Sequence, residues 1–420
     1  MNRSEVKRGR RMLFLRAAGL TAASVLPWRT ASAGPEAAPL SADLVPPWTK
    51  TQGHPILTPA YGERSKYEAA VVRAPIPGRV NTLTAASLTP LQDQRGIVTP
   101  SGLVFERHHA GVPDIPPGHH RLLVHGLVER PLAFTMDDVM RFPSVSRFHF
   151  LECSGNSAGE WKGKGSSAQV THGLLSCCEW TGVPVASVLQ EAGVDPRAKW
   201  LLAEGADAAA MTRSIPLDKA LDDALLVYAQ NGEMLRPEQG YPLRLLLPGF
   251  EGNMSIKWLR RLKLGELPFM TREETSKYTD LMPDGSARQF TFVMEAKSVI
   301  VRPSGGHTIR SRGFVEIEGY AWSGRGRIRR VDVSVDNGRT WREAQLQEPV
   351  LSKCLTVFRL PWQWDGGPAV LQSRAVDETG YVQPARNALL KARGTESYYH
   401  YNGIQSWRIG SDGRVENVHA

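Results

Sequence analysis

The sequence predicts an α+β protein in which a mixed domain is followed by an all-β domain. Up to about residue 290, short apolar strands such as "RLLVHGLV" and "YPLRLLLPG" alternate with helical stretches such as "VPVASVLQEAGV" and "IPLDKALDDALLVYA". After about Phe290, segments such as "FVEIEGYAWSG" alternate apolar and polar residues, and Asn337-Gly338 is a strong hairpin signal. No long apolar run follows the first thirty residues, so a soluble chain without a membrane span is expected.

Residues 1–33 are expected to be an export signal and not part of the fold. Arg10 and Arg11 precede an apolar run, and Ala31-Ser32-Ala33 forms a small-x-small cleavage site. This segment resembles a twin-arginine signal, which implies a periplasmic protein that folds around its cofactor before export. A membrane anchor is disfavoured because the apolar run is too short to span a bilayer.

The charge of the mature chain is close to balanced. Cleavage after residue 33 removes seven of the 51 basic and one of the 42 acidic residues, and it lowers the net charge from +9 to about +3. The composition therefore does not imply binding to nucleic acid. It favours local binding of small anions.

The remaining chain is predicted to form two domains, 34–290 and 291–420. Residues 34 to about 100 are rich in Pro, Gly, Ala and Thr, and they are expected to form an extended arm with little regular structure. The rest of the first domain is mixed α+β. Residues 291–420 are expected to be a β-sandwich of immunoglobulin-like size, made of strands and turns, with a C-terminal tail.

The stretch "FHFLECSGNSAGEW" raises the question of why a cysteine stands where a strand ends. Alternation over Phe148–Leu151 predicts a buried strand that delivers Cys153 to its end, where Gly155 allows a sharp turn. A buried structural cysteine is the alternative. The other cysteines, Cys177, Cys178 and Cys354, are too few and too irregularly spaced for a disulfide framework.

Two kinds of metal site are disfavoured by spacing. No Cys-x-x-Cys-His motif occurs, so no c-type haem is expected on this chain. The histidine pairs are adjacent in sequence, which does not fit a zinc site.

Several motifs together resemble the sulfite oxidase family of molybdenum enzymes. They are "VFERHHAGVP", "FLECSGN", "AEGAD", "NGEMLRPEQGYPLRLLLPG", "SIKW" and "GYAWSGRGRIRRVDVSVDNGRTW", in the family's order over roughly residues 100–400. The resemblance implies a molybdopterin-binding domain followed by an immunoglobulin-like dimerisation domain, and Cys153 as the protein ligand of a molybdenum–molybdopterin cofactor. A soft thiolate suits that metal. The residues at the family's cofactor-binding positions are Phe105, Arg107, His109, Cys153, Asp207, Arg244, Ser255 and Lys257.

The resemblance also implies a substrate pocket, and here the sequence departs from the family. Arg107, Tyr278 and Arg393 stand at pocket positions, together with Cys153, and are the expected catalytic residues. Ser157 and Ala158 stand where the family has an arginine pair, and Gln239 stands where it usually has histidine. Fewer fixed cations imply a substrate with less charge, or one tethered to something larger.

"ECSGNSAGEW", "SKYTDLMPDGSARQF" and "YYHYNGIQSW" resemble one branch of this family, the molybdenum subunits of Sox sulfane dehydrogenases. That resemblance implies oxidation of sulfane sulfur on a carrier protein's cysteine in bacterial thiosulfate oxidation. It also implies a c-type cytochrome subunit, expected to be dihaem, as electron acceptor, and a homodimer core within a hetero-oligomer. A sulfite dehydrogenase catalytic subunit is the main alternative. A sulfoxide reductase and a cofactor-free β-sandwich adhesion or carrier protein are further alternatives.

Overall fold

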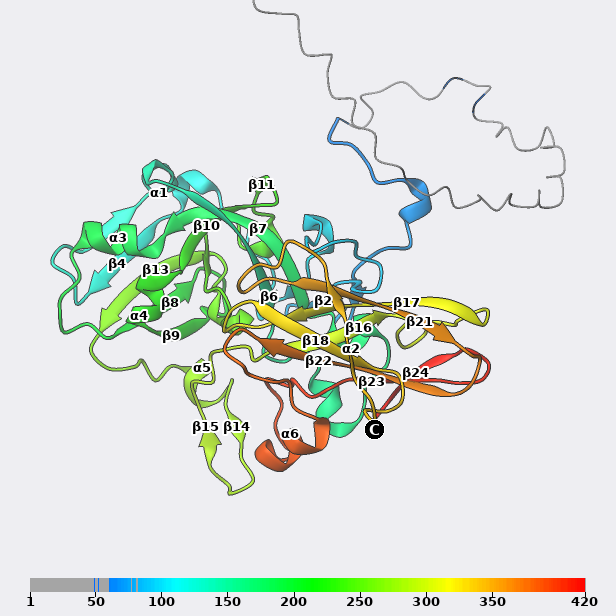
Figure 1. Ribbon diagram of the computed structural model, residues 1–420. Coiled ribbons are helices and arrows are strands. Elements are labelled where there is room, and N and C mark those ends of the chain that lie inside the picture. The colour runs from blue at the N-terminus through cyan, green and yellow to red at the C-terminus, as the bar shows by residue number, and fades with distance from the viewer. Residues whose placement is uncertain (1–48, 50–51, 53–59, 77, 81, 420) are drawn as a thin grey trace, which may run out of the picture. The chain divides into compact units, whose positions relative to one another are not determined.

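The structure is a computed structural model that describes residues 49, 52, 60–76, 78–80 and 82–419. The predicted export signal and most of the first part of the predicted arm lie outside the described residues. From Ser65 onward the described residues form one compact unit, to which both predicted domains contribute (Figure 1). The boundary between 290 and 291 stays a prediction.

The later part of the arm contributes short strands to a small sheet. Its order is β1-β2-β3, with β1 at Ala74–Pro75, β2 at Ala86–Leu88 and β3 at Glu106–Arg107. Because β3 carries Arg107, this sheet ties the arm to a predicted site residue.

Two larger sheets build the first domain. One has the order β11-β10-β7-β6, with β12 also paired to β10. Its strands are β6 (Val145–Glu152), β7 (Leu175–Pro184), β10 (Leu225–Gln230), β11 (Glu233–Met234) and β12 (Arg244–Leu246). The other has the order β5-β4-β13-β8-β9, in which β4 and β13 run parallel. Its strands are β4 (Leu122–Gly126), β5 (Leu132–Phe134), β8 (Trp200–Gly205), β9 (Thr212–Pro216) and β13 (Leu259–Gly265).

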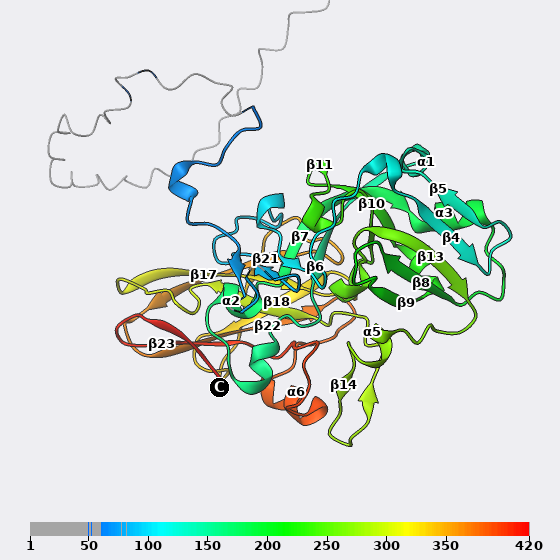
Figure 2. The same ribbon diagram turned by 180° about the vertical axis from the view of Figure 1, so that it is seen from behind.

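Short helices cover the second of these sheets. The helix α3 (Val185–Ala192) buries Val188 and Leu189 in an apolar core shared with β4, β8 and β13, and α4 (Leu217–Asp222) contacts β8 and β9. Figure 1 shows both helices beside this sheet, and Figure 2 shows α3 beside it from behind. The first domain also contains α1 (Met136–Arg141), which starts with a capping box, α2 (Ala168–His172) and α5 (Arg272–Thr275).

The prediction of one helical stretch over residues 215–229 is wrong in its second half. The chain passes from the end of β9 through α4 into strand β10. Leu225, Leu226 and Val227 pair with β7 on one side and β12 on the other. Asp222 and Asp223 stand at the carboxyl end of α4, where negative charge opposes the helix dipole. A short buried apolar run cannot be assigned by periodicity alone, and here pairing on both edges decides it.

Two antiparallel sheets form the β-sandwich, which confirms the predicted fold class. One has the order β16-β17-β21-β20 and the other β19-β18-β22-β23-β24. The strands are β16 (Lys297–Arg302), β17 (Gly313–Trp322), β18 (Ile328–Ser334), β19 (Arg342–Glu343), β20 (Gln345–Leu346), β21 (Thr356–Trp364), β22 (Ala369–Asp377), β23 (Ser406–Ile409) and β24 (Val415–Val418). Asn337 and Gly338 have φ of 63° and 76°, which fits the predicted turn between β18 and β19.

The second segment is not made of strands and turns alone. The helix α6 (Arg386–Arg393) interrupts the sandwich strands between β22 and β23. Its stretch "RNALLKAR" is rich in good helix formers, and Gly394 follows with a φ of 78°. A hairpin of β14 (Asp280–Leu281) and β15 (Ala287–Arg288) lies near α6 in Figures 1 and 2.

The sandwich core continues into the first domain. Phe150 of β6, Leu175 and Cys177 of β7 and Ala168 of α2 belong to the same buried cluster as Trp322. Strand β6, which leads to Cys153, is therefore packed against the sandwich. In the part of the chain that the structure describes, no helix is both long and apolar enough to cross a bilayer.

Candidate functional site

Cys153 follows directly after the last residue of β6, as predicted from the alternation of side chains. Eight residues of β6, Val145–Glu152, pair with β7, and the final three are buried. The Cys153 amide donates to Leu174 O at 3.0 Å. Burial raises the pKa of the Cys153 thiol. The strand therefore presents this thiol at its end, in a pocket.

The sharp turn after Cys153 does not depend on Gly155 in the way predicted. The left-handed residue is Ser157, with φ of 65° and ψ of 17°. A Cβ on Gly155 would lie 3.2 Å from Tyr398 Cε1. Gly155 therefore matters for the close approach of an aromatic ring, and the turn itself is completed two residues later.

An inner cavity of about 70 Å³ collects the predicted cofactor-binding residues. Lining it are Phe105, Arg107, His109, Cys153, Asp207, Arg244, Ser255, Lys257 and Tyr278. These residues come from far apart in the sequence, so only the fold brings them together. Other lining residues had not been predicted: His108, Leu151, Met211, Gly252, Asn253, Ile256 and Trp258. Trp258 stands in the "SIKW" motif, whose neighbour Lys257 was predicted.

Arg244 is a buried cation with unused hydrogen-bonding capacity. Its Nη1 donates to Gln239 O at 3.1 Å and to Gln239 Oε1 at 3.3 Å, and its Nε has no hydrogen-bond partner among the described residues. Burial lowers the pKa of Arg244 to about 10. Gln239, where the family usually has histidine, lines the cavity and donates to Phe105 O at 3.1 Å. Gln239 thus orients the Arg244 guanidinium through two hydrogen bonds.

Lys257 is a second buried cation on the same cavity. Its Nζ donates to Arg107 O at 3.2 Å, to Glu238 O at 3.0 Å and to His108 Nδ1 at 2.8 Å. Burial and Arg244 lower the pKa of Lys257. Two buried cations side by side favour an anionic ligand in this cavity.

Tyr278 and His109 form a pair at the mouth of the inner cavity. Burial, with Arg107 nearby, lowers the pKa of His109 to about 4, so the imidazole is neutral at pH 7. The Tyr278 hydroxyl lies 3.3 Å from His109 Nε2, and a neutral imidazole can accept its hydrogen bond. The Arg213 guanidinium lies 4.9 Å from the Tyr278 ring centroid, which fixes the ring from the other side.

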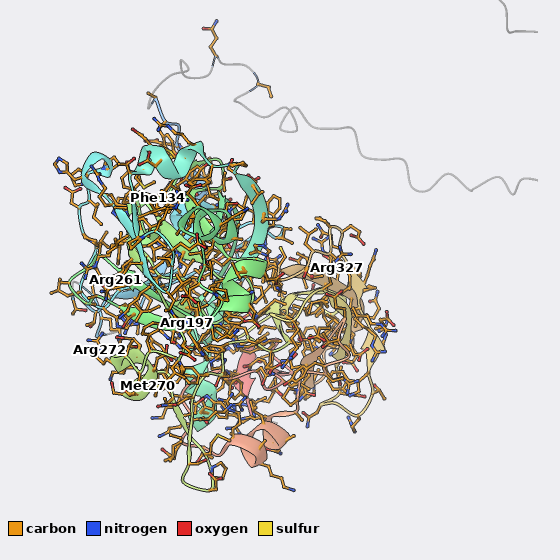
Figure 3. The ribbon with its side chains drawn as sticks, turned by 90° about the vertical axis from the view of Figure 1, so that its left-hand side faces the viewer. Phe134, Arg197, Arg261, Met270, Arg272 and Arg327 are labelled. Carbon is orange, nitrogen blue, oxygen red and sulfur yellow. The ribbon has the colours of Figure 1, made fainter. Side chains whose placement is uncertain are left out.

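A wider outer cavity of about 930 Å³ opens on the same residues. Arg107, His109, Cys153 and Tyr278 line both cavities. Further lining residues of the outer cavity include Arg79, Arg272, Glu273, Lys277, Tyr398 and Tyr399. Arg272 projects at the surface of the first domain near Met270 (Figure 3). The wall of the outer cavity therefore combines basic side chains and tyrosines with small or apolar residues such as Ala110, Ala208 and Met211.

Arg393 is the one predicted site residue that the structure does not bring to either cavity. Its guanidinium is ion-paired with the buried Asp280 and donates to His400 O at 3.2 Å. The same Asp280 carboxylate accepts from the amides of Tyr398 and Tyr399. Arg393 therefore stands behind the aromatic wall of the outer cavity.

Ser157 and Ala158, at the positions of the family's arginine pair, line neither the inner nor the outer cavity. The Ser157 hydroxyl is buried among His172 and Lys297. Small side chains at these two positions therefore add no space to the cavities, whereas Gly155 lines the outer cavity.

The residues present fit a molybdopterin cofactor. The unpartnered Arg244 Nε and the two buried cations suit its phosphate, and Cys153 is the thiol among the lining residues. When bound, that cofactor supplies two-electron oxygen-atom transfer chemistry.

Two family models match the chain. The oxidoreductase molybdopterin-binding domain matches residues 109–272, and the Mo-co oxidoreductase dimerisation domain matches residues 288–406. Mitochondrial sulfite oxidase of Mus musculus is 32% identical over 69% of this chain and 58% of its own length. Sulfite oxidase of Gallus gallus is 31% identical over 68% of each. The chain belongs to the sulfite oxidase family of molybdopterin-dependent oxidoreductases.

Within that family, one solved structure is particularly similar. A chain in the crystal structure of the sulfane dehydrogenase SoxCD from Paracoccus pantotrophus is 47% identical, with a TM-score of 0.88 over 90% of this chain and 98% of that chain. By contrast, this chain spans only 58% of the mouse and 57% of the human sulfite oxidase.

Proposed function

We propose that this chain is the catalytic molybdenum subunit of a sulfane dehydrogenase. Its substrate is sulfane sulfur bound to the cysteine of a carrier protein in bacterial thiosulfate oxidation. Its electrons pass to a c-type cytochrome subunit, since this chain carries no motif for attaching haem. The likeness to SoxCD supports this proposal.

The observation that carries the proposal is the size of the outer cavity. At about 930 Å³ it lies in the range that elsewhere accommodates drug-sized ligands, about 300–1,000 Å³, whereas sulfite is one sulfur atom with its oxygens. Cys153, Arg107 and Tyr278 line both the outer and the inner cavity. A protein segment in the outer cavity could therefore bring a terminal sulfur atom to these three residues.

Each of the residues that line the two cavities and were named above has a distinct role in this proposal. Cys153 ligates the metal as a thiolate, and Arg244 and Lys257 hold the cofactor's anionic groups. Arg107 attracts the partly anionic sulfur group of the substrate. The Tyr278 hydroxyl, whose ring lies against Arg213, donates its one proton to that group in place of His109 Nε2 when substrate is bound.

A sulfite dehydrogenase catalytic subunit is the second candidate. Arg107, Arg272 and Lys277 line the outer cavity, and such cations suit a small oxyanion. The similarity to sulfite oxidases favours the same alternative. Export by the twin-arginine route and pairing of subunits through the sandwich are further parts of the proposal, supported by Arg10 and Arg11 and by the dimerisation-domain match.

The deciding experiment compares two substrates on the purified enzyme with its cytochrome partner. We expect kcat/KM to be higher for a carrier-bound persulfide than for free sulfite, because protein contacts in the outer cavity contribute binding energy. Cys153→Ser should abolish turnover of both. Efficient sulfite oxidation with no activity on the carrier would establish the sulfite dehydrogenase alternative.

A further inference from the structure

We infer that the β-sandwich sets the geometry of the Cys153 loop, and that Lys297 is its main positioning residue. The Cys153 loop is defined here as residues 152–157. The inference rests on the proposed role of Cys153 as metal ligand. It gives the second domain a part in the active site beyond the pairing of subunits.

The residue before Cys153 is held by two donors from the sandwich. Lys297 Nζ, from β16, donates to Glu152 Oε1 at 3.3 Å. Trp322 Nε1, from β17, donates to Glu152 Oε2 at 2.7 Å. The side chains of Glu152 and Lys297 are only 1% and 2% exposed, so this ion pair is shielded from solvent. The strand end that precedes Cys153 is therefore fixed from the second domain.

The same ammonium group also holds the other end of the loop. Lys297 Nζ donates to Ser157 Oγ at 2.7 Å, and Ser157 Oγ lies 2.7 Å from His172 Nδ1. His172 Nε2 lies 3.1 Å from the Gln405 Oε1 acceptor, so Nε2 carries the proton and Nδ1 accepts from the Ser157 hydroxyl. Ser157, the left-handed residue of the turn, is thus bound on two sides.

A third contact from the sandwich segment reaches the middle of the loop. The His400 amide donates to Ser154 O at 2.8 Å. The Tyr398 ring lies against Gly155, where a Cβ would be 3.2 Å away. From the first domain, the Cys153 amide donates to Leu174 O, the Leu174 amide donates to Asn156 Oδ1 at 3.1 Å, and Asn253 Nδ2 donates to Ser154 Oγ at 2.9 Å. The first domain thus holds the middle of the loop, and the sandwich donors add the contacts at its two ends.

Lys297 is the one side chain that contacts both ends of the loop among these donors. If it is removed, Glu152 keeps its bonds from Trp322 and Asn156, but Ser157 loses a charged donor at a strained position. The loop then gains freedom at its far end. We therefore expect the removal of Lys297 to change the position of the Cys153 thiol as well as the overall stability.

The test uses the full-length chain with Lys297→Met, a substitution that keeps the apolar stem and removes the ammonium group. A hydrogen bond to a charged group is worth about 1.5–3 kcal/mol, so we expect cofactor retention to fall about tenfold or more. Molybdenum and pterin per chain are measured in protein purified from the same expression. The thiolate-to-metal absorption of the remaining holoenzyme should also shift.

A second readout does not require cofactor. In the full-length chain produced without molybdate, the rate at which a maleimide alkylates Cys153 is followed by peptide mass spectrometry. Cys177, Cys178 and Cys354 are at most 1% exposed, so Cys153 reacts first in the native state. We expect the rate in Lys297→Met to differ several-fold from the wild type.

Arg374→Met is the matched control. Arg374 is in the same domain, pairs with Asp332 and stacks on Trp341, away from the Cys153 loop. It should lower thermal stability without changing alkylation or cofactor content. Equal alkylation and cofactor content in Lys297→Met and Arg374→Met would overturn the inference. Ser157→Ala, which removes the hydroxyl that Lys297 binds and leaves the ammonium group in place, provides the same comparison if Lys297→Met does not fold.

The two hypotheses fail in different ways. A wild-type chain that acquires no molybdenum would contradict the proposed function, whereas the alkylation comparison would still test the inference. A molybdenum-loaded Lys297→Met with wild-type absorption and wild-type alkylation would contradict the inference alone.

Discussion

Two buried charged residues near Cys153 differ in how completely their hydrogen bonds are satisfied. Glu251 accepts from Arg213 Nη2 at 3.0 Å and Asn253 Nδ2 at 2.8 Å, and it pairs with His400 at 3.1 Å. Arg244, on the inner cavity, has an unpartnered Nε and no carboxylate partner among the residues that the structure describes. Glu251 therefore stabilises the protein without a ligand, whereas the buried charge of Arg244 is fully satisfied only when an anionic ligand binds.

Arg244→Met should separate stability from cofactor binding. Removing a buried, incompletely paired cation should raise the unfolding temperature of the cofactor-free chain. The same change should weaken retention of pterin about 10- to 150-fold, the equivalent of one charge-assisted hydrogen bond of ~1.5–3 kcal/mol. Pterin fluorescence per chain and thermal unfolding measure the two effects. A fall in both quantities would contradict the argument.

Glu251→Gln should remove a pH-dependent contribution to stability. Burial by itself raises the pKa of Glu251, but Arg213 and His400 hold it at about 2. Because a free glutamate has a pKa of about 4.3, the wild type gains ~3 kcal/mol above that pH and loses it as pH falls toward 2. Denaturant unfolding from pH 7 to pH 3 should show a lower and flatter profile in the variant. An unchanged slope would exclude this carboxylate as the cause.

At the scale of elements, the hairpin β14–β15 anchors the aromatic wall of the outer cavity. The Asp280 carboxylate, on β14, forms an ion pair with Arg393 of α6 and accepts hydrogen bonds from the amides of Tyr398 and Tyr399. Tyr399 in turn lies 5.2 Å from the Tyr278 ring centroid. Two regions far apart in sequence, around Asp280 and from Arg393 to Tyr399, thus meet at one carboxylate.

Asp280→Asn should destabilise this junction. The amide can still accept from the two tyrosine amides, but Arg393 is left as a buried charge without its counter-ion. Breaking such a pair costs ~3–5 kcal/mol. Denaturant unfolding checks the loss. Asp284→Asn, at the exposed tip of the same hairpin, is the control and should change stability by less than ~0.5 kcal/mol. Equal effects of the two substitutions would argue against the anchoring role.

At the scale of the whole molecule, one apolar cluster spans the first domain and the sandwich, in addition to the separate cluster around β4, β8 and β13. Phe150, Leu175 and Cys177 pack in the same cluster as Trp322 and Trp407. A truncation near residue 290 would expose these side chains to water, at about 25 cal/mol for each Å² of apolar surface. The first domain is therefore not expected to fold alone.

The full-length chain should unfold in one cooperative transition. Two weakly coupled domains would give two transitions, but a continuous core couples them. Differential scanning calorimetry of the cofactor-loaded protein is the measurement, with the ratio of calorimetric to van't Hoff enthalpy as the criterion. Two resolved transitions in the full-length protein, one for the first domain and one for the sandwich, would contradict this expectation.

Much of the site could be predicted from sequence because its residues stand in recognisable motifs. The strand before Cys153, the residues around Arg244 and Lys257 and the Asn337-Gly338 turn follow from local patterns and from the family resemblance. The second half of residues 215–229 could not be assigned, because an apolar run of this length fits a buried helix and a buried strand equally. Helix α6 was missed within a segment dominated by alternating residues.

The sequence by itself determined the fold class, the family and the position of the thiol, since strand alternation and motif order are local properties of the chain. Only the tertiary structure decided the environment of that thiol. The ends of its loop are held by Lys297, about 140 residues away in the chain, and Arg393 is placed behind the cavity by Asp280. Such contacts depend on packing between distant segments, for which neither periodicity nor spacing carries a signal.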